Sequence, residues 1–491
     1  MKYYSTRDNS RKVSAAQAIV QGLAPDGGLF IPETIPAVTP NDIEKLCKLD
    51  YQERAVFIMG KYLEEFSEDE LRGFVKEAYA ENYDSTAIAP TTFLNDDTGV
   101  LELWHGPTCA FKDMALQMLP RLLVASLGKL GEKRKVCILV ATSGDTGKAA
   151  LEGFADVSGT SIVVFYPRDG VSDVQKLQMT TQDGANVLVS AVEGNFDDAQ
   201  TGVKKIFGDR EFAADLDKKG FFLSSANSIN WGRLLPQIVY YFSAYCDYVN
   251  SGKIKPGDEI DFCVPTGNFG DILAGWYAKK MGLPVRKLIC ASNRNKVLTD
   301  FFETGVYDRN REFYTTISPS MDILVSSNLE RLLSLLAGGE KVNAWMEELK
   351  TTGKYNVGPD ILQKLRADFD CGCATDEEAK AAIGRLYKEG YLMDTHTADA
   401  YAVLEKLRAN RDRFPTVVVS TASPFKFCDS VLEAIGEGAD VSGAALIDRL
   451  AEKTERSAPG PLSGLGTRKV RFTGSVKKEQ MSDVVMDFLL K

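Results

Sequence analysis

The stretch KVCILVATSGDTGK, residues 135–148, joins a short apolar run to a turn rich in small and hydroxyl-bearing residues. The run at its start, Lys135–Ala141, is continuous and rich in Val, Ile and Leu, which is typical of a strand buried on both faces. The small residues that follow let the backbone approach an anion, and the free N–H groups at a helix start favour negative charge. A plain strand-to-helix turn explains the same residues equally well. In both cases the order of strand, turn and helix predicts one unit of a parallel α/β sheet.

The same alternation extends to both sides of this unit. Strands are expected at Lys135–Thr142, Thr160–Tyr166, Ala185–Val192, Glu259–Thr266, Val285–Ala291 and Thr416–Thr421. Helices are expected at Met114–Leu130, Trp231–Val249, Asp271–Met281 and Ala398–Leu407. Strands that alternate with helices in this way indicate an α/β fold built on open, mostly parallel, twisted sheets.

The length of the chain predicts more than one domain, because 491 residues exceed what one compact core usually accommodates. The N-terminal part is charged and periodic, and Ser14 and Gln17 have the spacing of a helix capping box. The expected parts are a mostly helical domain at 1–90, an α/β catalytic region in two halves at 91–455 with the smaller half at roughly 120–230, and a linker, strand and helix at 456–491.

Charge and hydropathy exclude several classes of partner. The net charge is −10, which disfavours a nucleic acid or an anionic membrane, since binding to phosphate-rich surfaces needs a basic face. The apolar runs are too short to cross a bilayer, and Met1–Arg11 lacks the apolar core of a secretory signal. We therefore expect a cytoplasmic protein with no nucleic-acid or membrane partner.

Cysteine and histidine usage limits the chemistry further. The nine cysteines are scattered, as expected for reduced thiols, and we interpret the one tight pair, Cys371-Gly-Cys373, as part of a loop. No histidine stands near that pair, so no metal site is expected. Because His105 and His396 are the only histidines, most chemistry must come from other side chains or from a cofactor.

Two further turns follow predicted strands, and ligands of open α/β sheets bind beyond the carboxyl ends of strands. Gly267-Asn268-Phe269-Gly270-Asp271 has the composition of a phosphate-binding turn, or of an ordinary turn capped by Asp271. Thr421 places a hydroxyl at a strand end, where a simple capping role is equally reasonable. The chain lacks the glycine spacing of a Walker A loop or a dinucleotide-binding motif, which argues against a nucleotide-binding protein.

Lys112 and the segment Asn227–Arg233 complete the candidate site. Apolar neighbours on both sides of Lys112 are expected to lower its pKa, as in lysines that form Schiff bases, although an exposed lysine is the default for any one position. Asn227, Ser228 and Arg233 are hydrogen-bond donors that suit a substrate phosphate, or else a cap and a surface arginine.

Taken in order, these motifs resemble long-form threonine synthases, a family of fold-type-II pyridoxal-phosphate (PLP) enzymes related to the tryptophan synthase beta chain. The resemblance covers nearly the whole chain. It rests on Tyr3–Thr6, Gly22–Phe30, His105–Asp113, Ser143–Gly147, Asn227–Arg233, Gly267–Asp271, Asp394–Ala398 and Ser420–Lys426.

The resemblance assigns roles to these residues. It implies that Lys112 is the catalytic lysine that holds the cofactor as a Schiff base and that Thr421 meets its pyridine nitrogen. The cofactor phosphate would lie in the turn Gly267, Asn268, Phe269, Gly270 and Asp271. The implied substrate-binding residues are Ser143, Asp145, Thr146, Asn227, Ser228 and Arg233, with Asp145 standing where many relatives carry an Asn beside the cofactor's phenol oxygen.

The implied activity is that of a carbon–oxygen lyase acting on phosphate. O-phospho-L-homoserine and water would give L-threonine and phosphate, the last step of threonine biosynthesis, in a monomer or a homodimer. Two alternatives stay open: another fold-type-II lyase of the serine/threonine dehydratase kind, and a non-catalytic PLP-binding relative.

Overall fold

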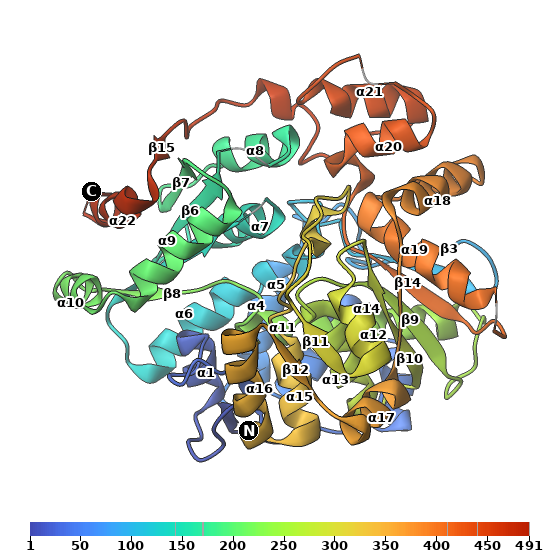
Figure 1. The fold of residues 1–491 in the computed structure, drawn as a ribbon, viewed down its shortest axis with the longest axis horizontal. Helices are drawn as coiled ribbons and strands as arrows, with labels where there is room; N and C mark the ends of the chain where they lie inside the picture. The colour runs from blue at the N-terminus through green and yellow to red at the C-terminus, as the bar shows by residue number, and fades with distance from the viewer. Residues whose placement is uncertain (143, 169–170, 410, 439, 491) are drawn as a thin grey trace.

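The computed structural model describes residues 1–142, 144–168, 171–409, 411–438 and 440–490, and it contains two separate α/β sheets (Figure 1). In the larger sheet every pair of neighbours is parallel except the antiparallel edge pair β3–β4. Its strand order is β13 (Phe369–Cys373), β10 (Val285–Ser292), β9 (Ile260–Pro265), β14 (Thr416–Ser420), β4 (Thr98–Glu102) and β3 (Thr91–Phe93).

The smaller sheet is parallel throughout and contains the stretch from which the fold was predicted. Its strand order is β15 (Ser475–Val476), β7 (Val187–Val192), β6 (Thr160–Pro167), β5 (Lys135–Ala141) and β8 (Phe221–Ser224). The β5 side chains from Val136 to Val140 are fully buried, as expected for a strand with helices on both faces. All six predicted strands are confirmed within two residues at each end.

Helices cover both sheets. Those of the smaller sheet are α7 (Asp145–Phe154), α8 (Asp173–Thr180), α9 (Phe196–Gly208), α10 (Arg210–Lys218) and α22 (Met481–Leu489). Those of the rest of the α/β region are α5 (Asp113–Leu116), α6 (Leu119–Leu130), α11 (Trp231–Leu234), α12 (Gln237–Asn250), α13 (Gly270–Met281), α14 (Val297–Thr304), α15 (Leu329–Ala337), α16 (Gly339–Thr352), α17 (Pro359–Asp368), α18 (Asp376–Lys388), α19 (Thr395–Arg408), α20 (Cys428–Ala434) and α21 (Ala445–Thr454). The strands β11 (Val306–Asp308) and β12 (Lys354–Asn356) form a small antiparallel pair in the same region.

The N-terminal segment is mostly helical and shares the main core. It contains β1 (Tyr3–Ser5), α1 (Ala15–Gln21), β2 (Phe30–Pro32), α2 (Pro40–Leu46), α3 (Tyr51–Gly60) and α4 (Glu68–Ala78). The predicted capping box of Ser14 and Gln17 is confirmed at the start of α1. The rings of Tyr3 and Tyr62 both lie 5.5 Å from that of Trp231 in α11. The N-terminal segment therefore packs directly on the α/β region; the domain boundaries themselves stay a prediction.

Two predicted helices are each divided in two, and a proline stands at each break. Met114–Leu130 is divided between α5 and α6, with Pro120 in the first turn of α6. Trp231–Val249 is divided between α11 and α12, where Pro236 precedes α12. Proline lacks the N–H that an unbroken helix would use, which explains both breaks.

The interpretation of Cys371-Gly-Cys373 as a loop is wrong. These residues form the end of β13, an edge strand paired in parallel with β10. Gly372 suits the strand because a Cβ there would lie 2.8 Å from Val403 Cγ1 of α19. The short strand packs closely under a helix and carries few of the β-branched residues by which strands are predicted.

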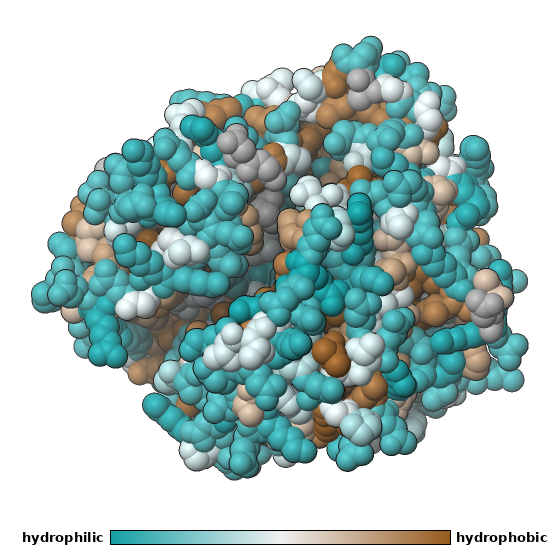
Figure 2. Space-filling view, viewed as in Figure 1, coloured by the Kyte–Doolittle hydropathy of each residue, from teal (hydrophilic) through white to brown (hydrophobic). Residues whose placement is uncertain are grey.

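The surface is mainly hydrophilic on the face that Figure 2 shows, with a hollow between the part that contains the smaller sheet and the rest. Among the residues that the structure describes, no helix combines the length and the hydropathy needed to cross a membrane.

A close approach of two helices next to Lys112 gives a first prediction. A Cβ added to Gly153 of α7 would collide with the backbone carbonyl of Leu116 in α5, whereas Gly128 of α6 has open space around it. Gly153→Ala is expected to lower the free energy of unfolding by about 1–3 kcal/mol, because backbone must move. The control Gly128→Ala should raise it by up to about 1 kcal/mol, through helix propensity alone. Urea titration followed by circular dichroism measures both, and equal values for the two variants would contradict the close packing.

Candidate active site

The end of β14 brings Lys112 and Thr421 side by side. The N–H of Phe111 donates to the carbonyl of Thr421 at 2.8 Å, and the N–H of Ser423 donates to the carbonyl of Cys109 at 3.0 Å. Lys112 follows this pairing directly, at the residue that precedes α5. The carboxyl end of a central strand therefore positions the lysine, as the general rule for α/β sheets predicts.

Lys112 is a buried lysine whose amine faces a carboxylate. Its residue surface is 8 % exposed, and Nζ lies 3.7 Å from Oδ2 of Asp145. Burial lowers the pKa of Lys112 to about 8; Asp145 opposes this change, whereas the positive charges of Arg233 and Lys426 add to it. An amine with such a pKa is partly uncharged near neutral pH and can act as a nucleophile or a base.

Asp145 is fixed on its other side by two donors. Its Oδ1 lies 2.9 Å from Nζ of Lys426 and accepts a 2.8 Å hydrogen bond from Nε2 of Gln175. Burial raises the pKa of the Asp145 carboxyl, but the ammonium groups of Lys426 and Lys112 outweigh burial and hold this pKa below its ordinary value. Asp145 is therefore ionised in the interior, between two lysines.

The turn before α13 has the backbone of an anion-binding loop. Phe269 adopts a left-handed conformation with φ of 63°, and its ring packs on Phe302. A Cβ on Gly267 would lie 2.8 Å from the carbonyl oxygen of Ser320, so the close approach requires glycine. The turn leads into the start of α13, where the first N–H groups have no partner within the helix.

Asp271 lies in the first turn of α13 and points toward α12. Its Oδ1 accepts hydrogen bonds from the hydroxyls of Tyr240 at 2.6 Å and Tyr241 at 2.8 Å. Burial raises the pKa of Asp271 to about 6, although both hydrogen bonds act against this rise. Its side chain thus anchors α13 on α12, and a direct contact of Asp271 with a cofactor phosphate stays a prediction.

The segment Asn227–Arg233 lies beside that turn. Ser327 connects the two, because its Oγ lies 3.5 Å from Oγ of Ser228 and donates to Oδ1 of Asn268 at 3.4 Å. Arg233 is buried, and its Nη1 donates to the carbonyl of Ala226 at 2.9 Å. Burial lowers the pKa of Arg233 to about 10, so it remains a cation at neutral pH.

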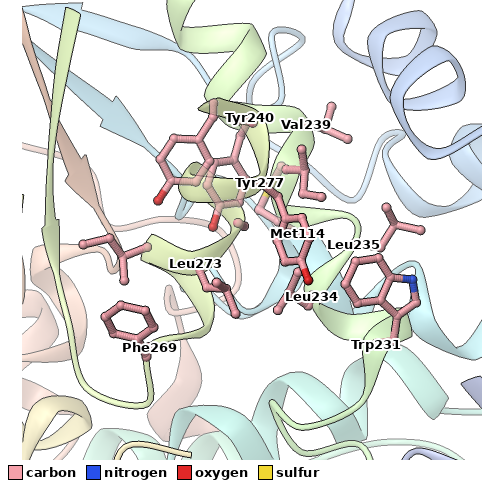
Figure 3. Close-up of a cluster of buried hydrophobic side chains, with 14 of the residues drawn as sticks. Met114, Trp231, Leu234, Leu235, Val239, Tyr240, Phe269, Leu273 and Tyr277 are labelled. Atoms are coloured by element: carbon pink, nitrogen blue, oxygen red, sulfur yellow. The ribbon is translucent and has the colours of Figure 1, made fainter. Parts of the chain in front are cut away.

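One apolar cluster sets the positions of these parts. Met114 of α5, Trp231 and Leu234 of α11, and Leu273 and Tyr277 of α13 lie together in it (Figure 3). The same three helices carry Lys112, Arg233 and the Gly267–Asp271 turn at or near their N-terminal ends. Because protein cores are tightly packed, the starts of these three helices are held in fixed positions relative to one another.

Three predicted substrate-binding residues remain: Ser143, Thr146 and Asn227. Thr146 is half-buried in the first turn of α7, and Asn227 is half-buried with its N–H donating to Oγ of Ser225 at 3.2 Å. Ser143 lies outside the described residues. The substrate-binding roles of all three stay predictions.

Sequence reasoning missed three residues that organise the site: Lys426, Gln175 and Asn328. Asn328 donates twice to the Asn268 carbonyl, from its backbone N–H at 3.1 Å and from its Nδ2 at 3.0 Å. Lys426 stood in a motif used for the resemblance, where its placement among apolar residues was the available signal. Gln175 and Asn328 had no local signal, because only the tertiary fold brings them to the site.

The two histidines lie at the edge of this region. His396 is buried at the start of α19, where its Nε2 accepts from the N–H of Ser320 at 3.2 Å and its Nδ1 lies 2.9 Å from Oδ2 of Asp394. His396 thus fixes the backbone of Ser320, whose carbonyl oxygen lies close to Gly267. His105 lies between Asp84 and Glu102, 2.9 Å from Oε2 of the latter.

The environment of His105 predicts a pH-dependent contribution to stability. Burial lowers the pKa of His105, but the hydrogen bonds that its ring donates to Asp84 and Glu102 outweigh burial and raise this pKa to about 9. The folded state therefore holds a proton that the unfolded chain releases near pH 6.5, so the contribution is complete below that pH and disappears as pH rises through about 9. His105→Gln should melt at a lower temperature than wild type at pH 6, with a difference that shrinks toward pH 9.5. A difference independent of pH would show that the carboxylates do not hold the proton.

Comparison with known proteins assigns this arrangement to a class. The sequence model described as "Pyridoxal-phosphate dependent enzyme" matches residues 93–422, more than half of the chain. Flanking matches are "Threonine synthase N terminus" at residues 2–79 and "Threonine synthase, C-terminal" at residues 397–484. The fold and the site thus define a PLP-dependent enzyme of fold type II, as predicted.

Comparison with individual relatives shows to which family of PLP-dependent enzymes the chain belongs. The threonine synthase of Saccharomyces cerevisiae is 40% identical over 465 residues, covering 88% of this chain and 89% of the yeast protein. The crystal structure of PLP-bound threonine synthase from Brucella melitensis is 38% identical, with a TM-score of 0.88 and full coverage of both chains. The chain belongs to the threonine synthase family.

Some relatives are longer than this chain. Human threonine synthase-like 1 is 42% identical over 444 residues, which cover 87% of this chain and 59% of the human protein. The chain thus spans about three fifths of the length of these threonine synthase-like relatives.

The donor set fits the cofactor of the family. PLP offers an aldehyde for an uncharged lysine, a phosphate for a helix N-terminus and a pyridine nitrogen for a hydroxyl. Lys112 supplies the amine, and the Gly267–Asp271 turn supplies free N–H groups before α13. Thr421 supplies the hydroxyl and lies next to Lys112, because its carbonyl accepts a hydrogen bond from the N–H of Phe111.

Proposed function

We propose that this chain is a threonine synthase, which converts O-phospho-L-homoserine and water to L-threonine and phosphate. The observation that carries the proposal is the placement of one buried, weakly basic amine, Lys112, close to two neighbouring groups of donors suited to anions. One is the turn before α13 and the other is the Arg233 segment. A substrate that carries its own phosphate, on a cofactor that carries another, needs two such sites.

The first site would hold the cofactor. Lys112 would bind it covalently, the backbone of Gly267–Gly270 would bind its phosphate, and Thr421 would meet its ring nitrogen. Bound PLP would withdraw electrons from the substrate carbon skeleton and so acidify its α-proton. Thr421 is neutral, so it would leave the ring less electron-withdrawing than a carboxylate partner would.

The second site would hold and orient the substrate. Arg233, with the amide of Asn227 and the hydroxyl of Ser228, would bind the γ-phosphate, and a buried guanidinium gives a strong, directed contact with such a group. Thr146 would lie near the charged end of the substrate. Binding at both ends fixes the α-carbon relative to Lys112, and this positioning lowers the barrier to proton transfer.

Lys112 would then move the protons. Once its amine is free, Nζ accepts the α-proton, since a pKa of about 8 leaves part of the amine uncharged near neutral pH. A β-proton and the γ-phosphate would then be lost, and the departing phosphate would take up a proton. The γ-carbon would gain one proton, and water would add its hydroxyl group at the β-carbon and release its other proton. The ammonium group of Lys112 would finally return a proton to the α-carbon. The low exposure of Lys112 keeps bulk water from the α-carbon during these steps.

The alternatives differ in what they bind. A serine/threonine dehydratase has no substrate phosphate, so it would leave Arg233 a buried cation without a ligand, a costly arrangement. A non-catalytic PLP-binding relative would have no need of a lysine with a lowered pKa. The Arg233 segment therefore favours the synthase over the dehydratase, and Lys112 favours it over the non-catalytic relative.

Product analysis tests the proposal. The purified chain with PLP is expected to release one phosphate per threonine formed from O-phospho-L-homoserine, and to act far more slowly on L-serine and L-threonine. Formation of 2-oxo acids from the latter pair at a comparable rate would favour the dehydratase. Binding of PLP without turnover of any of the three would favour the non-catalytic relative.

The state of the cysteines supports a cellular location. All nine cysteines are free, which suits a reducing compartment, and we propose that the enzyme acts in the cytoplasm. We further propose that it is a monomer or a homodimer.

A further inference from the structure

Asp145 stands between two lysines that come from distant parts of the chain. Lys112 precedes α5, and Lys426 follows β14. Lys426 is 1 % exposed, and its Nζ lies 2.9 Å from Oδ1 of Asp145 while donating to the carbonyl of Thr108, also at 2.9 Å. Neither contact uses the Asp145 oxygen that faces Lys112.

The contacts around Asp145 divide its two oxygens unequally. Oδ1 receives both Lys426 and Gln175, at 2.9 and 2.8 Å, whereas Oδ2 lies 3.7 Å from Nζ of Lys112. A distance of 3.7 Å is too long for a direct hydrogen bond. The Asp145 carboxylate thus forms a close ion pair with Lys426 and only a weaker electrostatic interaction with Lys112.

The other charges near Lys112 do not replace Asp145. The Asp113 carboxylate accepts from the N–H and Oγ1 of Thr108 at 2.8 and 2.7 Å, and Asp271 accepts from two tyrosines of α12. Arg233 of α11 adds a positive charge. A buried group with one shared counter-charge and two cationic neighbours is driven toward its neutral form.

We propose that Lys426 is a positioning residue that holds Asp145 by its far oxygen and so keeps the amine of Lys112 uncharged and reactive. The inference rests on the proposed function in taking Lys112 as the reacting amine. Lys426 itself touches no reacting atom. It acts by occupying the carboxylate that would otherwise pair with Lys112 and by adding a like charge nearby.

The test is the pH profile of Lys112 acylation in the full-length chain prepared without PLP. The chain is treated with acetic anhydride at a series of pH values, and acetylation of the Lys112 peptide is measured by mass spectrometry. Lys426→Met is expected to raise the midpoint of this profile by about one pH unit, because Asp145 then pairs with Lys112 alone. Acetylation at pH 7 should fall about tenfold. Lys426→Arg, which keeps the charge, should restore the wild-type midpoint to within about half a unit.

Asp145→Asn separates electrostatics from loosened packing. Loss of the carboxylate is expected to lower the Lys112 midpoint, opposite to Lys426→Met, because Lys112 then faces only cations. Water entering a loosened site would raise the midpoint in both variants. Equal midpoints in wild type and a folded Lys426→Met chain, or shifts of the same sign in Lys426→Met and Asp145→Asn, would overturn the inference. Wild-type chain that binds no PLP would instead count against the proposed function, so the two failures are distinct.

Discussion

Replacing Lys112 by alanine is expected to remove both threonine formation and the visible absorbance of bound PLP. Lys112 is the amine that would anchor the cofactor and move the substrate protons, so kcat should fall about 10⁴-fold or more. The fold should remain intact, because the lysine makes no side-chain cap to α5 and its removal relieves a desolvated charge. Absorbance spectra after addition of PLP, followed by a phosphate-release assay, measure both effects.

A surface lysine provides the control for that experiment. Lys350 of α16 has a side chain that is 78% exposed, so Lys350→Ala should leave spectrum and turnover at wild-type values. A Lys112→Ala chain that retained the wild-type absorbance band and turnover would place the cofactor on another lysine and remove the basis of the proposed site.

Arg233→Met is the second variant with a large expected effect. A buried arginine that binds the γ-phosphate contributes about 2–5 kcal/mol, so KM for O-phospho-L-homoserine should rise by about 30-fold or more. Inhibition by inorganic phosphate should weaken in parallel, because phosphate would use the same contacts. PLP binding should change little, since its phosphate is assigned to the turn before α13.

Arg54 offers a matched control, because it is also buried but lies in α3. Its Nε donates to the carbonyl of Leu46 at 2.9 Å and its Nη1 to Oγ of Ser243 at 2.7 Å. Arg54→Met should lower the free energy of unfolding without raising KM. If Arg233→Met behaved in the same way, Arg233 would be a structural residue and the substrate phosphate would bind elsewhere.

The sequence was most informative where a local pattern determines local structure. The buried strands β5, β6 and β9 were predicted because each is a continuous apolar run between turns. The edge strands β3 and β13 were missed because they are short, partly exposed and contain Thr or Cys and Gly. Such strands depend on pairing with a neighbour from elsewhere in the chain.

The same distinction applies to the site. Lys112 and the turn before α13 were predicted as site residues from local composition and from a resemblance in motif order, and the structure brings them together at one sheet edge. The ion pair of Asp145 with Lys426 was not foreseen, because a contact between a helix start and a segment almost 300 residues later leaves no local pattern. For Asp271, the pattern indicated the correct turn, and only the structure showed its two tyrosine partners.

The strand order of the larger sheet has a consequence for folding during synthesis. β4 lies between β3 and β14, yet β14 is made only after most of the chain has left the ribosome. Until then β4 is paired on one side only, in a two-stranded unit that is marginally stable by itself. The free edge of β4 must therefore be protected throughout translation, and a ribosome stalled before β14 would present an exposed edge prone to aggregation.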